Sequence, residues 1–469
     1  MTVASPPALP ADIVDAFATH VARTRYEHLP PLAVAKAKTF LLDTIGVGLA
    51  GTSGPHFARI SRAAEAWGRG EEATVWGSGL KLPAPSAAMV NAYLIHCLEY
   101  DCVHERAVVH PMATILSAFF AWAERSGGRG RPVDGRQLLT SLTVGVDMSG
   151  LLGSATTAPI RFFRPAVAGG FGAVSAIGSA AGFTAAQMAD AYGIQYGQCA
   201  GTLQPHAEGS GLLPLQIGFN ARAAITSADL VEAGFDGPHD VLTGQYGYYN
   251  LFELGQYTPE VIPDELGRVW QIARLSHKPF PSGRLTHGAL DGLRQVMAEG
   301  ITAADIASVE IQAPPLVKRL VGRPDLDNPP ANYAKLCLSF VAATLLLRGR
   351  VDVPEFAGDT VLNDPEIHAY ARRISVVDDG NPDQNALAPQ RVIVRLTSGG
   401  TRVIDLPEVY GHPEAPLTDA ENRAKFARCC GWAVPPVPDA RRAEIERMVD
   451  QIEDVTDVGQ IAKLMVSDG

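Results

Sequence analysis

The stretch RVIVRLTSGGTRVIDL, residues 391–406, separates this chain from an all-helical protein. Val392, Val394 and Leu396 alternate with polar residues, and a Ser-Gly-Gly-Thr turn follows them. Alternation with period two around a glycine-rich turn predicts a β-hairpin. Similar alternation at 308–313 and 373–377 predicts further strands, with helical patterns interleaved at 284–299, 333–348 and 364–373. We therefore expect an α+β domain over residues 271–406.

The chain on either side of this domain is typical of helices. Long apolar segments without β-branched alternation run through 85–125, 135–155, 166–200 and 212–234. After residue 419, apolar residues again fall at helical spacing. The expected fold is mainly α with an inserted α+β domain. Residues 1–270 and 407–469 would form a large helical domain and residues 271–406 a smaller α/β lid domain, with a cleft between them for a small molecule.

Composition excludes several classes of protein. The 469 residues are 46% hydrophobic and 19% charged, which is typical of a folded chain too long for one core. The formal net charge of -11 leaves no basic footprint for nucleic acid or an anionic membrane. Many of the 46 glycines sit in apolar runs such as Ala166–Phe183, which predicts helices packed closely through small residues and no membrane span.

Cysteine usage and the N-terminus predict a cytoplasmic protein. The six cysteines form no CxxC pair and no disulfide framework. The opening residues MTVASPPALPADIV show neither a basic region nor an apolar core of an export signal.

The segment HCLEYDCVHERAVVHP, residues 96–111, concentrates acid, base and ligand side chains. His96, Glu99, Asp101, His104 and His110 lie where a helix gives way to a loop, and Pro111 starts the next helix. Three interpretations are open: helix caps that satisfy one another, a metal site of unusual spacing, or acid/base catalysis on a carboxylate. The third would use His110 and His104.

Two other segments carry cations. Arg161 and Arg164 precede the glycine-rich helix and suit a carboxylate, although a solvated pair of loop charges would look the same. In HKPFPSGRLTH, residues 277–287, Lys278 lies near Arg284 and His287. Such a cluster suits an anionic substrate on an acidic protein, and Lys278 would act as a base if desolvated. The alternative is a surface lysine.

Five stretches resemble the MmgE/PrpD family. They are LLDTIGVGLAG (41–51), NAYLIHCLEYDCVHERAVVHP (91–111), HKPFPSGRLTHGALDGL (277–293), the 333–349 helix and GHPEAPLTDAENRAKF (411–426). They occur in the family's order over nearly the whole chain. The resemblance implies a helical domain with a smaller α/β domain, usually as a homodimer. Members include 2-methylcitrate dehydratase, cis-aconitate decarboxylase and iminodisuccinate epimerase.

The family pattern also differs from this chain at identifiable positions. Its loop reads roughly LDYDDTH followed by HP. Here Glu99 replaces the first acid, Asp101, His104 and His110 are kept, and Cys102 and Val103 replace an Asp and a Thr. Leu213 and Gln216 stand where one branch has a lysine and a histidine, Phe163 stands for a histidine and Phe340 for a tyrosine. Lys278, Arg284 and His287 match.

These observations predict a lyase that needs neither cofactor nor metal and acts on a small di- or tricarboxylate. His110, Lys278, His104 and Asp101 would carry the chemistry, abstracting a proton beside a carboxylate and eliminating water as 2-methylcitrate dehydratase does. The substrate would be held by Arg161, Arg164, Arg284, His287, Gln216 and Glu99. The alternatives are an epimerase, isomerase or decarboxylase using the same groups, a metal-dependent hydrolase, or a catalytically silent binding protein.

Overall fold

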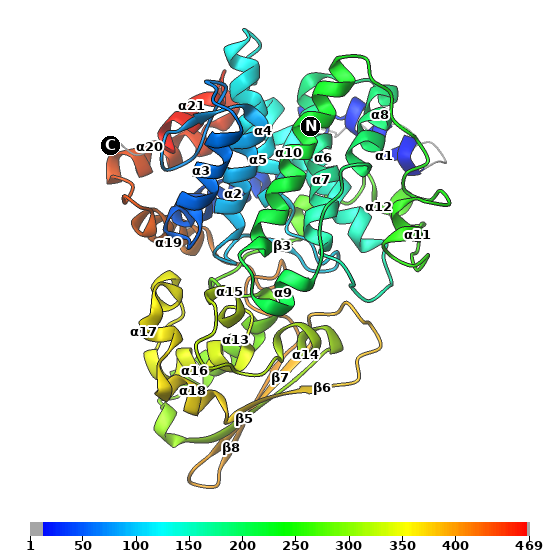
Figure 1. Cartoon of the computed structure of the whole chain (residues 1–469). Coiled ribbons are helices and arrows are strands. Elements are labelled where there is room, and N and C mark those ends of the chain that lie inside the picture. The colour runs from blue at the N-terminus through cyan, green and yellow to red at the C-terminus, as the bar shows by residue number, and fades with distance from the viewer. Residues whose placement is uncertain (1–12, 467–469) are drawn as a thin grey trace.

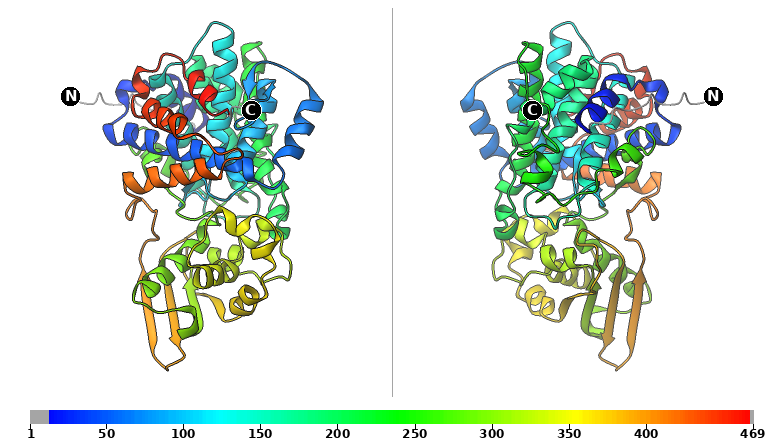
Figure 2. Two further views of the ribbon diagram at one scale, coloured as in Figure 1. Left: turned by 90° about the vertical axis from the view of Figure 1, so that its left-hand side faces the viewer. Right: turned by 90° about the vertical axis from the view of Figure 1, so that its right-hand side faces the viewer.

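The computed structural model describes residues 13–466, which form a large helical lobe and a smaller lobe built around a sheet (Figure 1). The described part of the chain begins and ends in the helical lobe, and residues from about 280 to 406 form most of the smaller lobe (Figure 2). The predicted fold class, mainly α with an inserted α+β unit, is confirmed.

The helical lobe contains long helices that pack around one large hydrophobic core. Its helices are α1 (Ile13–Arg23), α2 (Pro31–Ala50), α3 (Phe57–Trp67), α4 (Ala84–His96), α5 (Pro111–Gly128), α6 (Gly135–Ser154), α7 (Arg164–Ala181), α8 (Ala185–Tyr196), α10 (Leu212–Glu232), the short α11 (Tyr248–Leu251) and α12 (Val261–Glu265), and the C-terminal α19 (Asp419–Trp432), α20 (Asp439–Asp450) and α21 (Gly459–Leu464). Small residues set the spacing of the central helices, as predicted. A Cβ on Gly145 of α6 would lie 2.7 Å from the carbonyl oxygen of Gly172 on α7.

The smaller lobe holds a four-stranded sheet in the order β6-β5-β7-β8. Strand β5 (Ile306–Ala313) runs parallel to β6 (Ile374–Asp378) and antiparallel to β7 (Gln390–Leu396), and β7 forms the predicted hairpin with β8 (Thr401–Leu406). Helices α13 (His287–Ala298), α14 (Pro315–Val321), α16 (Leu338–Arg348) and α18 (Pro365–Ala371) cover one face (Figure 2). The other face stays open, which accounts for the alternating burial along β5 and β7.

Two helices expected from the sequence are interrupted. The segment 166–200 divides at Gly182, whose φ of 73° ends α7, and Thr184 then caps α8. The segment 333–348 divides into α15 (Ala331–Ala334) and α16, because the backbone between them has partners elsewhere. The Lys335 carbonyl accepts a hydrogen bond from the Gly283 amide, and the Lys335 ammonium donates to the Cys97 carbonyl.

The two lobes meet at a short two-stranded ladder. Strand β3 (Val103–His104) pairs antiparallel with β4 (Leu275–Ser276), with Val103 opposite Ser276. This ladder joins the loop after α4 to the segment that leads into the smaller lobe. It therefore places residue 278 beside the 96–110 loop.

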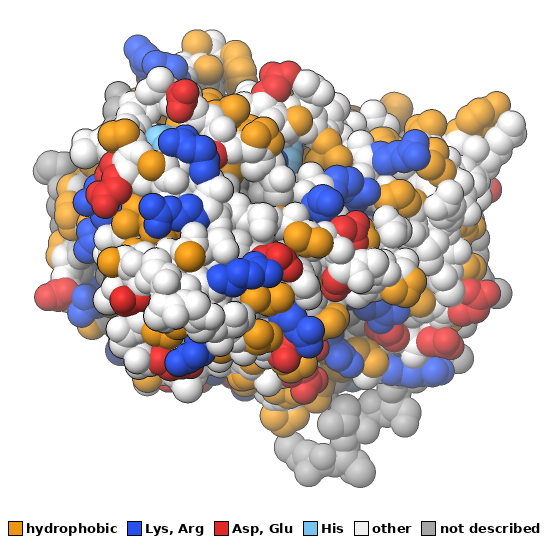
Figure 3. Space-filling view, turned by 90° about the horizontal axis from the view of Figure 1, so that it is seen from below, with side chains coloured by type: hydrophobic (Ala, Val, Ile, Leu, Met, Phe, Trp, Pro, Cys, Tyr) orange, Lys and Arg blue, Asp and Glu red, His pale blue; other side chains and the backbone are white. Residues whose placement is uncertain are grey.

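The surface carries charges of both signs. Figure 3 shows the sheet end of the molecule, where Lys and Arg side chains alternate with Asp and Glu and form no broad patch of one sign. In the described range 13–466, none of the helices combines the length and the apolar character that a bilayer crossing requires.

Candidate active site

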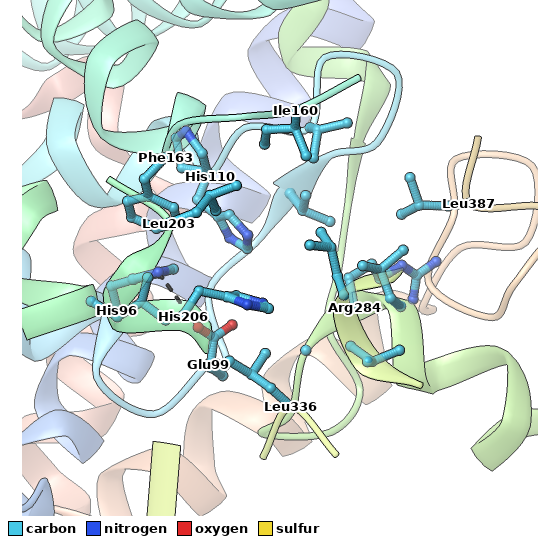
Figure 4. A pocket seen from close by; sticks show the side chains of 18 residues that line it. His96, Glu99, His110, Ile160, Phe163, Leu203, His206, Arg284, Leu336 and Leu387 are labelled. Atoms are coloured by element: carbon cyan, nitrogen blue, oxygen red, sulfur yellow. Dashed lines mark ion pairs between the residues drawn. The ribbon is translucent and has the colours of Figure 1, made fainter. Parts of the chain in front are cut away.

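A pocket lies between the two lobes, next to the β3–β4 ladder (Figure 4). It encloses about 630 Å³ including its opening to solvent, and most of its 18 lining side chains are apolar. The lining residues are His96, Glu99, Val103, Val108, His110, Ile160, Phe163, Pro165, Leu203, His206, Leu213, Gly283, Arg284, Leu285, Leu320, Val321, Leu336 and Leu387. Ionisable groups gather at one end, where His96, Glu99, His110 and His206 face a common space.

Local structure explains how these groups converge. His96 is the last residue of α4, and His110 immediately precedes α5, where Pro111 occupies the first helical position. The loop between them turns back so that Asp101 lies between the two imidazoles. Lys278 enters from the segment after β4, held in register by the ladder.

The ionisable groups form one buried network. Asp101 accepts hydrogen bonds from His96 Nδ1 at 3.0 Å to both carboxylate oxygens, and its Oδ2 lies 3.2 Å from His110 Nδ1. Lys278 Nζ donates to Glu99 Oε2 at 2.9 Å and lies 4.0 Å from Asp101 Oδ1. His96 Nε2 lies 3.6 Å from Glu99 Oε1. Both Asp101 and Lys278 are fully buried, so water does not stabilise their charges and the oppositely charged groups of the network must do so.

The network separates the two histidines in basicity. Burial would lower the pKa of His96, but the adjacent Asp101 and Glu99 outweigh burial and raise it. Burial lowers the pKa of His110, and the Lys278 ammonium adds to this effect. At neutral pH the arrangement therefore favours a protonated His96 next to a neutral His110. Such a pair supplies an acid and a base within one site.

The two carboxyl groups remain ionised. Burial would raise the pKa of Glu99, but Lys278, His96 and His110 outweigh it and lower it to about 2. The pKa of Asp101 lies well below its ordinary value for the same reason, with His96 and His110 opposing burial. An ionised carboxylate only accepts hydrogen bonds, so His96 Nδ1 carries hydrogen, and the 3.2 Å approach of Asp101 Oδ2 favours hydrogen on His110 Nδ1 as well. A neutral His110 then keeps its lone pair on Nε2, which has no protein partner in the range 13–466.

Backbone strain marks the same loop. Glu99 and Val108 line the pocket, and their φ angles are 53° and 52°. A β-branched residue such as valine rarely adopts this left-handed conformation. Strain of this kind persists where surrounding contacts impose it, and it concentrates at functional sites. Here it turns the Glu99 carboxylate toward Lys278.

Arg284 also reaches the pocket, but its guanidinium is already engaged. It donates to Glu105 Oε1 at 2.8 Å and to the backbone carbonyls of His277, Val409 and Tyr410. His287 packs behind it, fully buried, with Nε2 donating to the Ser282 carbonyl. His287 does not line the pocket.

The remaining residues predicted to bind substrate lie outside the pocket lining. Arg164 is completely buried in an ion pair with Glu253 at 2.9 Å, so its charge is neutralised by the protein. Arg161 is exposed on the surface. Gln216 forms two hydrogen bonds with the Thr202 backbone and fixes that loop. In this geometry Arg164 and Gln216 stabilise the structure around the pocket and do not contact its interior.

His104, predicted to be an acid or base, is a buried residue of strand β3. Its Nδ1 accepts from the Ala107 amide and its Nε2 donates to Gln271 Oε1 at 3.0 Å. Burial lowers its pKa to about 4. Both ring nitrogens are occupied and the ring does not line the pocket, so the geometry gives His104 the task of shaping the loop.

Sequence reasoning missed two groups of the site. His206 lines the pocket, and its Nδ1 lies 2.8 Å from an Arg323 guanidinium nitrogen. Burial, together with Arg323, lowers the pKa of His206 to about 4. Glu105, the partner of Arg284, was part of the 96–111 segment but received no role. Nothing in the local pattern distinguishes either residue, because their partners lie more than a hundred residues away.

Positions that depart from the MmgE/PrpD pattern gather at this pocket. Phe163 and Leu213 both line it, and Glu99 supplies its carboxylate. Phe340 is buried in the core of the smaller lobe and does not line the pocket.

Three groups could in principle hold a metal ion. Ligand atoms of His96, Asp101 and His110 lie within 4.8 Å of one another. The Lys278 ammonium lies 4.0 Å from Asp101, however, and already supplies positive charge there. A divalent cation would have to overcome that repulsion, so the donor set fits a proton-transfer network better than a metal centre.

Comparison with known proteins finds two matching family models and several relatives. A model of the MmgE/PrpD N-terminal domain matches residues 15–260, and a model of the MmgE/PrpD C-terminal domain matches residues 280–451. The chain is 26% identical over 473 residues to a cis-aconitate decarboxylase from Homo sapiens, covering 97% of this chain and 94% of that protein. It is 24% identical over 460 residues to one from Aspergillus terreus, covering 94% and 93% respectively. The chain belongs to the MmgE/PrpD family.

Proposed function

We propose that this protein is a lyase that transfers protons on a carbon atom next to a carboxylate of a small organic acid. The observation that carries the proposal is the buried network in which Asp101 orients both His96 and His110 beside the Lys278–Glu99 pair. A base and an acid with oppositely shifted pKa values at one end of a pocket suit acid/base catalysis. The relatives named as cis-aconitate decarboxylases support a carboxylate substrate.

Elimination of water uses both histidines. Nε2 of neutral His110 takes the proton from the carbon next to the carboxylate. The resulting electron pair is delocalised into that carboxylate, whose charge the Lys278 ammonium offsets. The pair then forms the new double bond as the neighbouring C–O bond breaks, and His96 donates its proton to the departing hydroxyl. Asp101 holds both rings in position throughout and is a positioning residue.

Decarboxylation is the second candidate. Here the C–C bond to a carboxylate breaks, CO2 leaves, and the carbanion takes a proton from His96 or from protonated His110. The apolar walls favour this step because a carboxylate loses CO2 more readily when its charge is poorly solvated. The activity named for the relatives from Homo sapiens and Aspergillus terreus favours it too.

Solvent exchange tests the proposal without a known substrate. The protein is incubated in D2O with a panel of saturated and unsaturated mono-, di- and tricarboxylates, and deuterium at carbon is measured by NMR and mass spectrometry. We expect enzyme-dependent incorporation in at least one acid, and its loss in His110→Ala. New olefinic signals identify dehydration, and release of CO2, measured as bicarbonate, identifies decarboxylation. Absence of exchange across the panel would contradict the proposal and favour a silent binding protein.

A further inference from the structure

We infer that His206 is a further catalytic residue, whose Nε2 donates a hydrogen bond to the substrate oxygen on which negative charge develops. Arg323 is the positioning residue that holds the imidazole in this state. The inference rests on the proposed function and deepens it, because it names another group of the same site that touches substrate. It follows from the place of His206 in the pocket, from its bond with Arg323 and from the engagement of the other ionisable groups.

His206 lies where the helical lobe meets the smaller lobe. It belongs to α9 (Gln204–Glu208), a short helix beside α15 (Figure 1). Its partly buried side chain lines the pocket, and Figure 4 shows the imidazole extending from the side of Glu99 toward Arg284. A ligand in the pocket would therefore contact the imidazole of His206.

Arg323 decides which ring nitrogen of His206 carries the hydrogen. A guanidinium donates hydrogen bonds and cannot accept them. Nη2 of Arg323 lies 2.8 Å from His206 Nδ1 and 2.8 Å from the Leu320 carbonyl oxygen, so these two acceptors take both of its hydrogens. Nε2 of the imidazole is 3.5 Å from Nη2. Burial, together with Arg323, lowers the pKa of His206 to about 4, so at neutral pH the ring is uncharged and its one hydrogen lies on Nε2.

The Nε2–H group of His206 is available to a ligand. In the range 13–466, no acceptor lies within hydrogen-bond distance of it. The guanidinium behind the ring is itself fixed, since Nε of Arg323 donates to the Leu320 carbonyl at 3.2 Å and Nη1 donates to the His206 carbonyl at 2.9 Å. It also lies 4.8 Å from the centre of the Tyr333 ring. A hydrogen bond from a cation to Nδ1 polarises the imidazole and strengthens Nε2–H as a donor.

The other ionisable side chains of the pocket lining have tasks that exclude this one. They are His96, Glu99, His110 and Arg284. Protein acceptors occupy the donors of Arg284, and the Glu99 carboxylate only accepts. His96 gives up its proton in the proposed reaction, and His110 takes one. His206 therefore supplies the side-chain donor that can bind a substrate oxygen without losing its hydrogen.

The charge around this part of the pocket favours an anionic oxygen. Glu99 is paired with Lys278, but Arg323 and Lys335 have no carboxylate within salt-bridge distance in the described range. Lys335 is buried directly before Leu336 of the lining, and its ammonium donates to the Cys97 carbonyl at 3.0 Å. Two cations without carboxylate partners attract a polycarboxylate, and they stabilise negative charge on an oxygen bound at His206.

The proposed proton transfer shows when this hydrogen bond matters. As His110 Nε2 takes the proton from carbon, the electron pair moves into the adjacent carboxylate, and negative charge grows on its oxygens. The hydrogen bond from His206 Nε2 to one of these oxygens then strengthens, while the hydrogen stays on His206. An interaction that is stronger in the transition state than in the bound substrate raises kcat more than it changes KM.

Two substitutions of His206 separate hydrogen-bond donation from proton transfer. His206→Gln keeps an N–H donor near the position of Nε2 but cannot titrate, and His206→Phe keeps a ring without a donor. We expect His206→Phe to lower the kcat of deuterium exchange by about 10²–10³ and to change KM less than about tenfold. We expect His206→Gln to stay within about tenfold of the wild type and to keep both limbs of the pH profile.

His239→Phe is the matched control, because His239 is exposed outside the pocket, where Asp190 is its partner. It should leave kcat unchanged. If His206→Gln is as inactive as His206→Phe, or if His206→Phe is no slower than the control, His206 is not a donor of the proposed kind.

A double-mutant cycle tests the positioning role of Arg323. Arg323→Met removes the donor to His206 Nδ1, so we expect kcat to fall about tenfold or more in the wild-type background. In the His206→Phe background the same substitution should have little further effect, because the ring that it positions is gone. Equal falls in the two backgrounds would mean that Arg323 only stabilises the fold.

Nitrogen-15 NMR of the full chain, labelled at histidine, gives a readout that does not need turnover. Comparison with His206→Gln assigns the His206 signals. From about pH 6 to about pH 8 we expect Nε2 protonated and Nδ1 unprotonated, and Arg323→Met should mix the two tautomers. Addition of the carboxylates used in the exchange panel should shift the Nε2–H signal with at least one acid. An Nε2 without hydrogen, or an Nε2–H signal that no acid of the panel moves, would overturn the inference.

The two readouts separate this inference from the proposed function. An Nε2–H signal that moves with a carboxylate, in a protein that exchanges no deuterium into any acid, would support the hydrogen bond and contradict the lyase. Deuterium exchange that His206→Phe leaves unchanged would support the lyase and contradict the role of His206.

Discussion

Replacement of Lys278 by methionine would show whether this buried ammonium keeps Glu99 ionised. Burial alone would raise the pKa of Glu99, yet Lys278, His96 and His110 together lower it from 4.5 to about 2. The difference between these two values corresponds to about 3 kcal/mol of folding free energy at neutral pH. Removal of one partner from a buried ion pair typically costs about 3–5 kcal/mol. We therefore expect Lys278→Met to lose a few kcal/mol of stability at pH 7.

The pH dependence gives this prediction its sharpest form. Without Lys278, burial dominates and we expect the pKa of Glu99 to rise above its ordinary 4.5. The folded state then binds the proton more tightly than the unfolded state, so the variant gains stability as pH falls from 7 toward 5. One such group contributes at most about 1.4 kcal/mol per pH unit. In the wild type, Glu99 is ionised in both states above about pH 5 and contributes almost no slope.

Urea unfolding followed by far-UV circular dichroism at pH 5, 6 and 7 measures both effects. The stability difference between wild type and Lys278→Met should be largest at pH 7 and narrow by about 1–2 kcal/mol at pH 5. The double variant Lys278→Met/Glu99→Gln is the control, since it removes the titrating carboxyl and should abolish the narrowing. Parallel pH profiles for wild type and Lys278→Met would refute the assigned pairing.

Four further outcomes follow from the same structure. His110→Ala should lower any measured rate by about 10²–10⁴, and a fall of less than tenfold would remove it from the mechanism. The pH–rate profile should be bell-shaped, because activity is lost when His110 gains a proton below pH 6.5 and when His96 loses one above pH 6.5; a flat profile would contradict the acid/base pair. Prolonged chelation should leave the rate unchanged within twofold, whereas loss restored by a metal would favour a metal site at His96, Asp101 and His110. Gly145→Ala should lower the free energy of unfolding, measured by urea denaturation, by about 1–3 kcal/mol, because the added methyl group clashes with Gly172. Gly431→Ala should not lower it, because the space around Gly431 is open.

The fold was largely predictable because its signals are local. Period-two alternation at 391–406 predicted the hairpin of β7 and β8, and glycine-rich apolar runs predicted the close contact of α6 and α7. The prediction of one continuous helix over 333–348 was wrong, because the structure divides this segment into α15 and α16. Its interruption depends on bonds from Lys335 to residues far away in sequence, which no local pattern reveals.

The sequence predicted which residues the site contains, but it did not predict which partners they have. His96, Asp101 and His110 are close in sequence, and the predicted turn of the loop brings them together. Whether a cation is available to a substrate depends instead on its partners. Arg164 is neutralised by Glu253, 89 residues further on, and Arg284 by Glu105, 179 residues earlier. The same residue type thus becomes an anchor or a structural group according to contacts that only the folded chain defines.

The β3–β4 ladder has a consequence for how a molecule would enter. Lys278 is tied by this ladder to the loop that carries Glu99 and Asp101, whereas Leu285, Leu320 and Leu387 pack in the core of the smaller lobe. A hinge beyond residue 278 would carry the hydrocarbon wall away and leave every ion pair of the network intact. Admission of a ligand would then require hydrophobic surfaces to separate, together with the Arg284–Glu105 ion pair, which joins the two sides of the hinge.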